Sequence, residues 1–177
     1  MSRLTQSARK SVTASPRSTA SSALARPSLP TPAAMESWYE HYRGLGIPAE
    51  IDPPGVSIHT SSDLAGLEVR EPLGHLLFEQ LRGLYLAGPI LRRNTGDGQR
   101  WVFLAVPPGW PRGCAYLELL RAGGTPLDHG TRIPLPVGPD ATDGWVNEPE
   151  LGRELPSLFT VTAQVRKLYQ AKLAAGR

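Results

Sequence analysis

Glycine and proline interrupt this chain throughout its length. The 177 residues include 18 glycines and 18 prolines, about a fifth of all positions and well above the usual share. Proline removes a backbone donor and fixes one dihedral angle, and glycine weakens the interior of helices and strands. The sequence therefore predicts short elements joined by many turns, and it excludes a bundle of long helices.

Apolar side chains recur every three or four residues in several stretches, as on the buried face of a helix. The clearest stretch is residues 73–84, which follows Pro72, a residue suited to the first turn of a helix. Residues 36–43 and 158–173 show the same spacing, and residues 114–121 form a shorter stretch that ends before Gly123 and Gly124. Four helices are expected.

Strands are expected between these helices. Residues 56–60 and 67–69 are short apolar runs, and residues 102–106 are continuously apolar, as in a central strand covered on both faces. The turn-forming sequence "NTGDG" at residues 94–98 lies between two apolar runs and predicts a β-hairpin. Two further strands are expected in "TPLDHGTRIPLPVG" and "DGWVNEP", the first at a sheet edge because prolines interrupt it.

This order of elements predicts an α+β fold, with a mainly antiparallel sheet flanked by short helices. Residues 47–55, which contain Pro48, Pro53 and Pro54, are expected to form a turn-rich connection rather than a regular element. Residues 35–177 are predicted to form a single domain, since a chain of this length can bury one core.

Residues 1–34 differ in composition from the rest of the chain. They contain five basic residues and no acid, so the remaining residues hold 14 basic and 16 acidic side chains. Few large apolar side chains are available to offset the entropy of ordering, so a disordered basic tail rich in Ser, Ala and Pro is expected. Two alternatives stay open: an organellar transit peptide, or a translation start at Met35.

Several function classes are excluded by the residues that the chain lacks. Cys114 is the only cysteine, so neither an intramolecular disulfide nor a cysteine-based zinc site can form. The sequence contains no P-loop, no G-x-G-x-x-G fingerprint and no Gly-x-Ser-x-Gly elbow. No apolar run is long enough to span a bilayer, which predicts a cytoplasmic protein without a membrane partner. The excess of Arg over Lys, with abundant Ala, Gly and Pro, is typical of a high-GC bacterial genome.

An ordered series of short motifs points to a family. The series is "LEVREPLG", then "AGPI", "RWVFLAVPPG", "LELLRAGG", "LDHG" and "LPVGPDATDGWVNEP", all within residues 56–149. Together these motifs resemble the C-terminal half of the N-terminal domain of actinobacterial bifunctional DNA primase/polymerases, the prim-pol group. The N-terminal half of that domain has no counterpart in this chain.

The resemblance implies two-metal nucleotidyl transfer, in which at least three carboxylates hold divalent ions. Two of these carboxylates lie two residues apart on one strand, so that both point to the same face. Glu68 matches one of the two positions, and Gly66 occupies the other and has no side chain to bind a metal. Asp128 in "LDHG" matches the third acid, although a tight turn explains an aspartate there equally well.

A further departure concerns the histidine with which the family contacts the nucleotide. At the matching position this chain has Gln99, Arg100 and Trp101. The sequence therefore favours a degenerate, non-catalytic member over an enzyme, with Glu68 and Asp128 as vestigial site residues and with no cofactor. The alternative is a residual nucleotidyltransferase that binds Mg²⁺ or Mn²⁺ through these two acids, with Asp63 as a third.

Three arginines around the predicted hairpin are the candidates for contacts with nucleic acid: Arg92, Arg93 and Arg100. By resemblance their partner is DNA or a nucleotide, and the expected role is that of a binding or accessory module linked to DNA replication. Exposed arginines are also common on hairpins, so a purely structural role stays open. A third hypothesis is a homodimeric interaction module, because Leu, Val and Tyr recur on the predicted C-terminal helix.

Overall fold

The computed structural model describes residues 30–107, 114–138 and 143–176. The fold is α+β, as predicted, with four helices and eight strands in antiparallel sheets within these ranges. The elements in chain order are α1 (Pro32–Gly44), β1 (Glu50–Asp52), β2 (Gly55–His59), β3 (Ala65–Arg70), α2 (Glu71–Gly83), β4 (Ile90–Thr95), β5 (Gly98–Ala105), α3 (Cys114–Ala122), β6 (Gly124–Pro126), β7 (Arg132–Leu135), β8 (Gly144–Asn147) and α4 (Leu158–Ala175).

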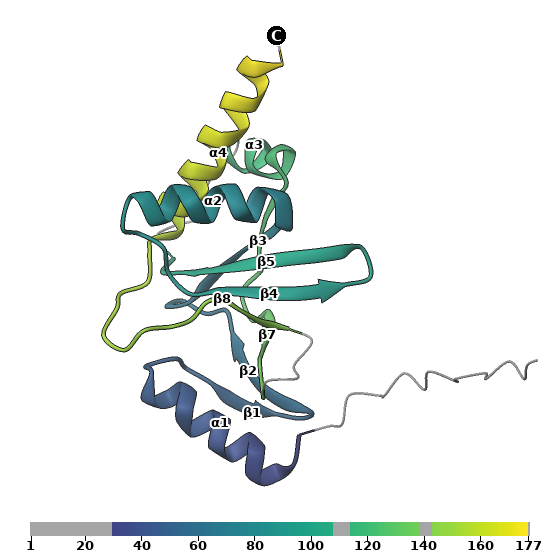
Figure 1. Ribbon diagram of the computed structural model, residues 1–177, viewed down its shortest axis with the longest axis vertical. Helices are drawn as coiled ribbons and strands as arrows, with labels where there is room; N and C mark the ends of the chain where they lie inside the picture. Colours follow the sequence, from purple (N-terminus) through teal and green to yellow (C-terminus); the bar gives the residue numbers. More distant parts are fainter. Residues whose placement is uncertain (1–29, 108–113, 139–142, 177) are drawn as a thin grey trace, which may run out of the picture.

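Two sheets carry the fold. The larger has five strands in the order β6-β3-β5-β4-β8, and the smaller has three in the order β1-β2-β7. Helices α2, α3 and α4 lie on one side of the five-stranded sheet, whereas the small sheet and α1 lie on the other (Figure 1). The molecule is therefore layered, with the five-stranded sheet in the middle.

The central strand β5 shows why two cores form. Trp101, Phe103 and Ala105 pack in the core beneath the helices, and the alternate residues Val102 and Leu104 pack in the core shared with the small sheet. All five side chains are buried. The continuously apolar run therefore covers both faces of one strand, as its sequence predicted, because successive side chains point to opposite faces.

Helix α2 packs closely on this strand because of one glycine. A Cβ atom at Gly74 would lie 2.8 Å from two atoms of the Trp101 indole ring. The His75 ring also contacts this indole, with ring centroids 4.4 Å apart. Gly74 thus allows the helix backbone to rest directly on a buried tryptophan.

The structure corrects three expectations about element bounds. α1 begins at Pro32 rather than near residue 36, since Thr31 caps it by accepting a hydrogen bond from the Ala34 amide at 3.3 Å. Residues 32–34 of the predicted tail are thus helical, and the expectation for residues 1–29 lies outside the described residues. In the connection at residues 47–55, Ile51 pairs with Val56, which makes β1 a strand.

The third correction concerns "TPLDHGTRIPLPVG", which was expected to be one strand. It forms two: β6 pairs with β3 in the large sheet, and β7 pairs with β2 in the small sheet. β7 lies at a sheet edge, where its proline Pro134 is tolerated. None of the helices in the described ranges is both long enough and apolar enough to cross a membrane.

Candidate functional site

Glu68 lies between two arginines on the face of the large sheet that is opposite the helices. Its carboxylate oxygens are 3.7 Å from Arg93 Nη1 and 3.6 Å from Arg100 Nη1. The three side chains are only 18%, 26% and 19% exposed, respectively. Partial burial makes such pairs stronger than those on an open surface, because less water screens them. The acid predicted as a vestigial metal ligand is therefore engaged by two cations.

The strand register extends this pair into a row of three arginines. Arg70 on β3 is directly opposite Arg100 on β5, which is directly opposite Arg93 on β4. Residues opposite each other in an antiparallel pair share a face of the sheet, and like charges in such positions repel. We call Arg70, Arg93 and Arg100 the arginine row. Arg93 Nε is buried and has no hydrogen-bond partner in the described part of the chain.

The position of the second expected acid is filled by an apolar side chain. Gly66 lies on the same face as Glu68, and a Cβ atom there would be 2.7 Å from Leu127 Cδ1 and 3.4 Å from Val102 Cγ1. The Leu127 amide also donates to the Gly66 carbonyl oxygen at 2.9 Å. A carboxylate at this position would therefore have no room in the present packing.

Asp128 lies in the turn before β7. A tight turn was the structural explanation that the sequence offered for an aspartate at this position. The Asp128 carbonyl oxygen accepts hydrogen bonds from the hydroxyls of Thr60 and Thr131, and its side chain is exposed. Asp63 lies in another turn, where its amide donates to Ser61 Oγ at 3.1 Å. Among the described residues no hydrogen bond or ion pair joins Glu68 to either aspartate, and no three His, Cys, Asp or Glu side chains form a group that could hold a metal ion.

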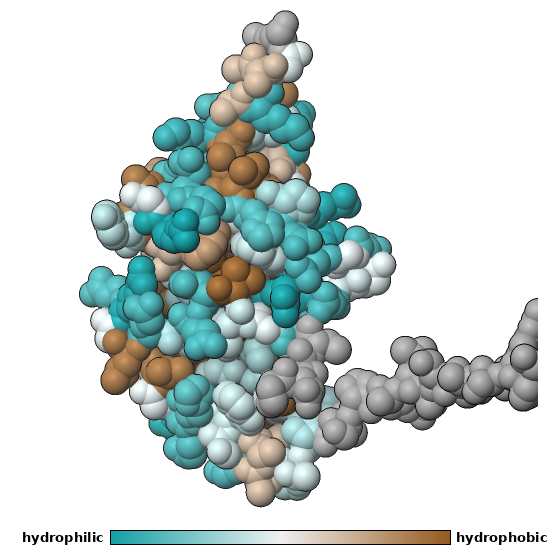
Figure 2. Space-filling model, viewed as in Figure 1, coloured by the Kyte–Doolittle hydropathy of each residue, from teal (hydrophilic) through white to brown (hydrophobic). Residues whose placement is uncertain are grey.

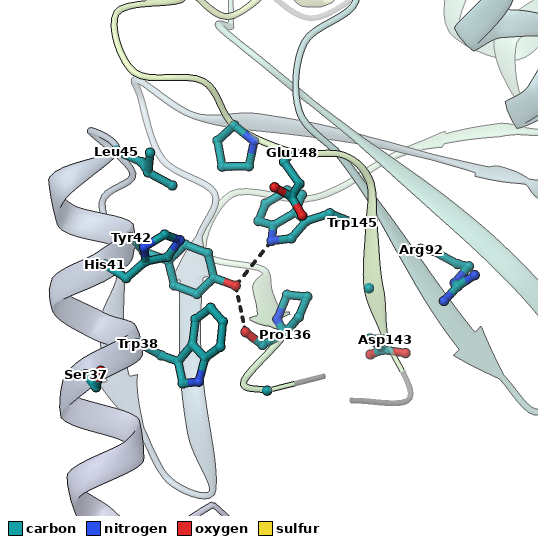
Figure 3. A pocket seen from close by; sticks show the side chains of 13 residues that line it. Ser37, Trp38, His41, Tyr42, Leu45, Arg92, Pro136, Asp143, Trp145 and Glu148 are labelled. Atoms are coloured by element: carbon teal, nitrogen blue, oxygen red, sulfur yellow. Dashed lines mark hydrogen bonds between the residues drawn. The ribbon is translucent and has the colours of Figure 1, made fainter. Parts of the chain in front are cut away.

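Of the three predicted arginines, the structure brings Arg93 and Arg100 together and separates Arg92 from them. Arg92 is opposite Trp101 and Gly144, so it lies on the other face of the sheet from Arg93, and it is one of the residues that line a pocket beside α1 (Figure 3). Arg70 was not among the arginines predicted from the sequence to contact nucleic acid. It lies two residues after Glu68, and this period-two spacing was the available signal that the two side chains share a face.

The pocket has a volume of about 560 Å³ and was not expected from the sequence. Residues of α1, β4 and β8 line it, together with residues that follow α1, β7 and β8. Tyr42, which is buried, donates a hydrogen bond to the Pro136 carbonyl oxygen at 2.6 Å and accepts one from Trp145 Nε1 at 3.2 Å (Figure 3). The residues that line it include Trp38, His41, Tyr42, Arg92, Asp143, Trp145 and Glu148.

Burial raises the pKa of the Tyr42 hydroxyl above its usual value. The hydrogen bond from Trp145 opposes this shift in pKa, and the negative charge of Glu148 adds to it. The carboxylate of Glu148 thus acts electrostatically on the phenol in the pocket wall.

Comparisons with known protein families, with curated proteins and with solved structures find no match for this chain. A carboxylate held by two guanidinium groups is a poor ligand for a divalent cation, whereas three arginines with two acids, Glu68 and Asp97, keep one excess positive charge that attracts an anion. The arrangement can bind phosphate.

Proposed function

We propose that this protein is a primase/polymerase-like module without polymerase chemistry, which acts in the cytoplasm as an accessory binding protein linked to DNA replication. The arginine row holds the phosphate groups of DNA or of a nucleotide. The observation that carries the proposal is the register of Arg70, Arg100 and Arg93 across three adjacent strands, with Glu68 as the partly buried counter-ion of Arg93 and Arg100.

Two contacts support the loss of catalysis. Leu127 fills the space beside Gly66, where the resemblance to the primase/polymerases requires a second acid. Glu68 is paired with Arg93 and Arg100, so a metal ion would have to displace or approach two cations. Mg²⁺ gives up its water ligands only when carboxylates and phosphates replace them, and one neutralised carboxylate does not offer that.

The charge and donors of the arginine row support phosphate binding. Arg70, Arg93 and Arg100 share a face of the sheet with Glu68, and Asp97 lies 4.0 Å from Arg100, so three arginines against two acids leave an excess of one positive charge. Guanidinium donors match the geometry of phosphate oxygens and form two parallel hydrogen bonds with them.

Fluorescence anisotropy with labelled single-stranded and double-stranded DNA tests this proposal. We expect Arg93→Ala and Arg70→Ala each to weaken binding about tenfold, as for the loss of a charge-assisted contact of about 1.4 kcal/mol. Arg121→Ala, which removes an exposed arginine on α3, is the matched control and should bind as the unmodified chain does. Equal affinities for all four proteins would refute the role of the row, and Arg70→Ala keeps the test valid if Arg93→Ala impairs folding, since Arg70 is exposed.

A primer-synthesis assay with Mg²⁺ or Mn²⁺ tests the alternative of a residual nucleotidyltransferase. We expect no incorporation of nucleotides under either metal. Incorporation that Glu68→Ala abolishes would replace the proposed binding role with the enzymatic one.

A homodimer is a second proposal, favoured by the C-terminal end of α4. This end projects beyond the other helices (Figure 1), and Leu173 on it is half exposed, whereas Val161 and Val165 nearer its start are buried. Apolar residues lie among hydrophilic ones over the helix layer (Figure 2). If two copies pair through this end, light scattering after size exclusion gives twice the mass of one chain, and Leu173→Glu restores a single chain.

A further inference from the structure

The pocket beside α1 has a different chemistry from the arginine row. Its side chains come from α1, from β4 and β8, and from the residues after β8, and they include neither Glu68 nor any residue of the row. Its volume of about 560 Å³ lies within the usual range for small-molecule sites. The pocket is therefore separate from the arginine row, and its own groups determine which ligand chemistry fits it.

Aromatic rings form one part of this pocket. Tyr42 is central: its ring centroid is 5.9 Å from that of Trp38 and 6.1 Å from that of Trp145. His41 packs edge-on against Trp38 at 5.4 Å. Tryptophan and tyrosine rings attract a positive charge that approaches their faces, because the faces carry negative charge density.

The charged groups at the pocket also favour a cation. The lining includes two carboxylates, those of Asp143 and Glu148, one guanidinium, that of Arg92, and the imidazole of His41. Asp143 Oδ1 already accepts a hydrogen bond from the Asn94 amide at 2.9 Å. Glu148 is exposed and has no ion pair or hydrogen bond within the described part of the chain. The pocket therefore offers one uncommitted acid beside aromatic rings.

We propose that this pocket binds an organic cation, a guanidinium or ammonium group, through the faces of Trp38 and Trp145 and the carboxylate of Glu148. An anion fits less well, since it would meet two carboxylates and only one arginine. The site goes beyond the proposed function, because phosphate binding on the row neither requires it nor predicts it.

Titration of the full chain with N-acetyl-L-arginine amide, followed by the indole N–H signals in ¹H–¹⁵N spectra, tests the proposal. We expect the signals of Trp38 and Trp145 to shift and saturate in the millimolar range, while that of the buried Trp101 stays in place. The citrulline analogue, which has the same shape without the charge, should leave all signals unchanged. Glu148→Gln should weaken the affinity for the arginine probe at least fivefold.

Glu154→Gln is the matched control, because it removes the same charge from an exposed acid outside the pocket. It should leave the titration unchanged. The proposal is wrong if the citrulline and arginine probes bind equally well or if Glu148→Gln has no effect. It is also wrong if Glu148→Gln and Glu154→Gln weaken the affinity for the arginine probe equally. DNA binding by the row should be unchanged in Glu148→Gln, so the failure of either proposal can be recognised separately.

The cation can belong to a separate molecule or to Arg26, the basic residue before α1 that is nearest to it in sequence. The same titration on Arg26→Ala distinguishes the two sources. Tighter binding of the probe by that variant assigns the site to the chain's own arginine, and unchanged binding assigns it to a separate ligand.

Discussion

At the scale of single residues, Glu68 offers the sharpest test, because two functions give it opposite roles. As a metal ligand it would be needed for binding, whereas as the counter-ion of Arg93 and Arg100 it weakens their attraction for phosphate. We expect Glu68→Gln to raise the affinity for DNA about three- to tenfold, since it removes a negative charge from within the row. Anisotropy measures this change, with Glu154→Gln as the control for net charge.

The same substitution should lower stability. The ion pairs of Glu68 are partly buried, and without them the like charges of Arg93 and Arg100 face each other. We therefore expect the free energy of unfolding of Glu68→Gln to fall by about 1 kcal/mol. Urea unfolding measures this loss. A variant that loses both affinity and stability would argue against the counter-ion role.

Tyr42 makes stability depend on pH in the alkaline range. Because the pKa of its hydroxyl is raised in the folded protein, the folded state keeps this proton after the unfolded state has lost it. The stabilisation is complete below the usual tyrosine pKa of about 10 and is lost as the pH rises through the higher folded value. Tyr42→Phe should therefore lower stability by about 1 kcal/mol at pH 7, through its lost hydrogen bonds, and reduce the decline above pH 10.

Thermal unfolding between pH 7 and pH 11 measures both effects. Tyr85→Phe serves as the control, because the Tyr85 side chain is 90% exposed. It should leave the alkaline decline as it is in the unmodified chain. A decline of the same size in Tyr42→Phe would show that other groups cause it.

At the scale of helices and strands, the contact of α2 with β5 depends on Gly74. Alanine is the better residue in a free helix by about 1 kcal/mol, but here its methyl group would meet the Trp101 ring at 2.8 Å. Overpacking of a buried core costs about 1–3 kcal/mol. We expect Gly74→Ala to destabilise the protein on balance, and Gly83→Ala, where nothing lies within 4 Å, to be neutral or stabilising. Urea unfolding of the two variants gives the comparison.

The start of α1 depends on Thr31, four residues before Met35. Its hydroxyl accepts from the Ala34 amide, and its carbonyl oxygen accepts from the Met35 amide at 2.9 Å. Thr31→Ala should lower the free energy of unfolding by about 1 kcal/mol, and Thr31→Ser should preserve it. Equal stability of the two variants in thermal unfolding would show that the cap contributes nothing.

Sequence patterns predicted an element well where neighbouring residues alone determine its structure. The hairpin of β4 and β5 was predicted from the turn-forming residues Asn94, Gly96, Asp97 and Gly98, and in the structure Gly98 adopts a positive φ of 110°, a conformation that suits glycine. β1 was missed because the prolines around it indicate turns, while its pairing with β2 depends on the tertiary fold. The split of "TPLDHGTRIPLPVG" was missed for a similar reason: β6 and β7 are defined by partners in different sheets, β3 and β2, which a pattern along one segment does not identify.

The same limit applies to the candidate site. The period of two predicted that Glu68 shares a face with the position of Gly66, and the structure agrees. Which arginines reach Glu68 depends on the register of three strands, so Arg92 and Arg93 could not be distinguished in sequence, although they point to opposite faces. The pocket depends on α1 meeting β8, a contact of residues about a hundred positions apart.

At the scale of the whole molecule, the distribution of charge decides how binding to DNA should respond to salt. Residues 35–177 hold 14 basic and 16 acidic side chains, so the folded part has no general attraction for a polyanion. Binding must then come from the arginine row, from the five basic residues before position 35, or from both. Each phosphate neutralised contributes about −0.7 to −0.9 to the slope of log K against log salt concentration.

Contacts by the row alone predict a slope of about −2 to −3, whereas contacts that include all five N-terminal charges predict about −6 to −7. The double variant Arg93→Ala/Arg100→Ala should make the slope shallower by about 1.5, because two of the three contacts of the row are lost. Anisotropy titrations at several salt concentrations measure both slopes. A steep slope that the double variant leaves unchanged would assign DNA binding to the N-terminal residues and leave the row with a structural role only.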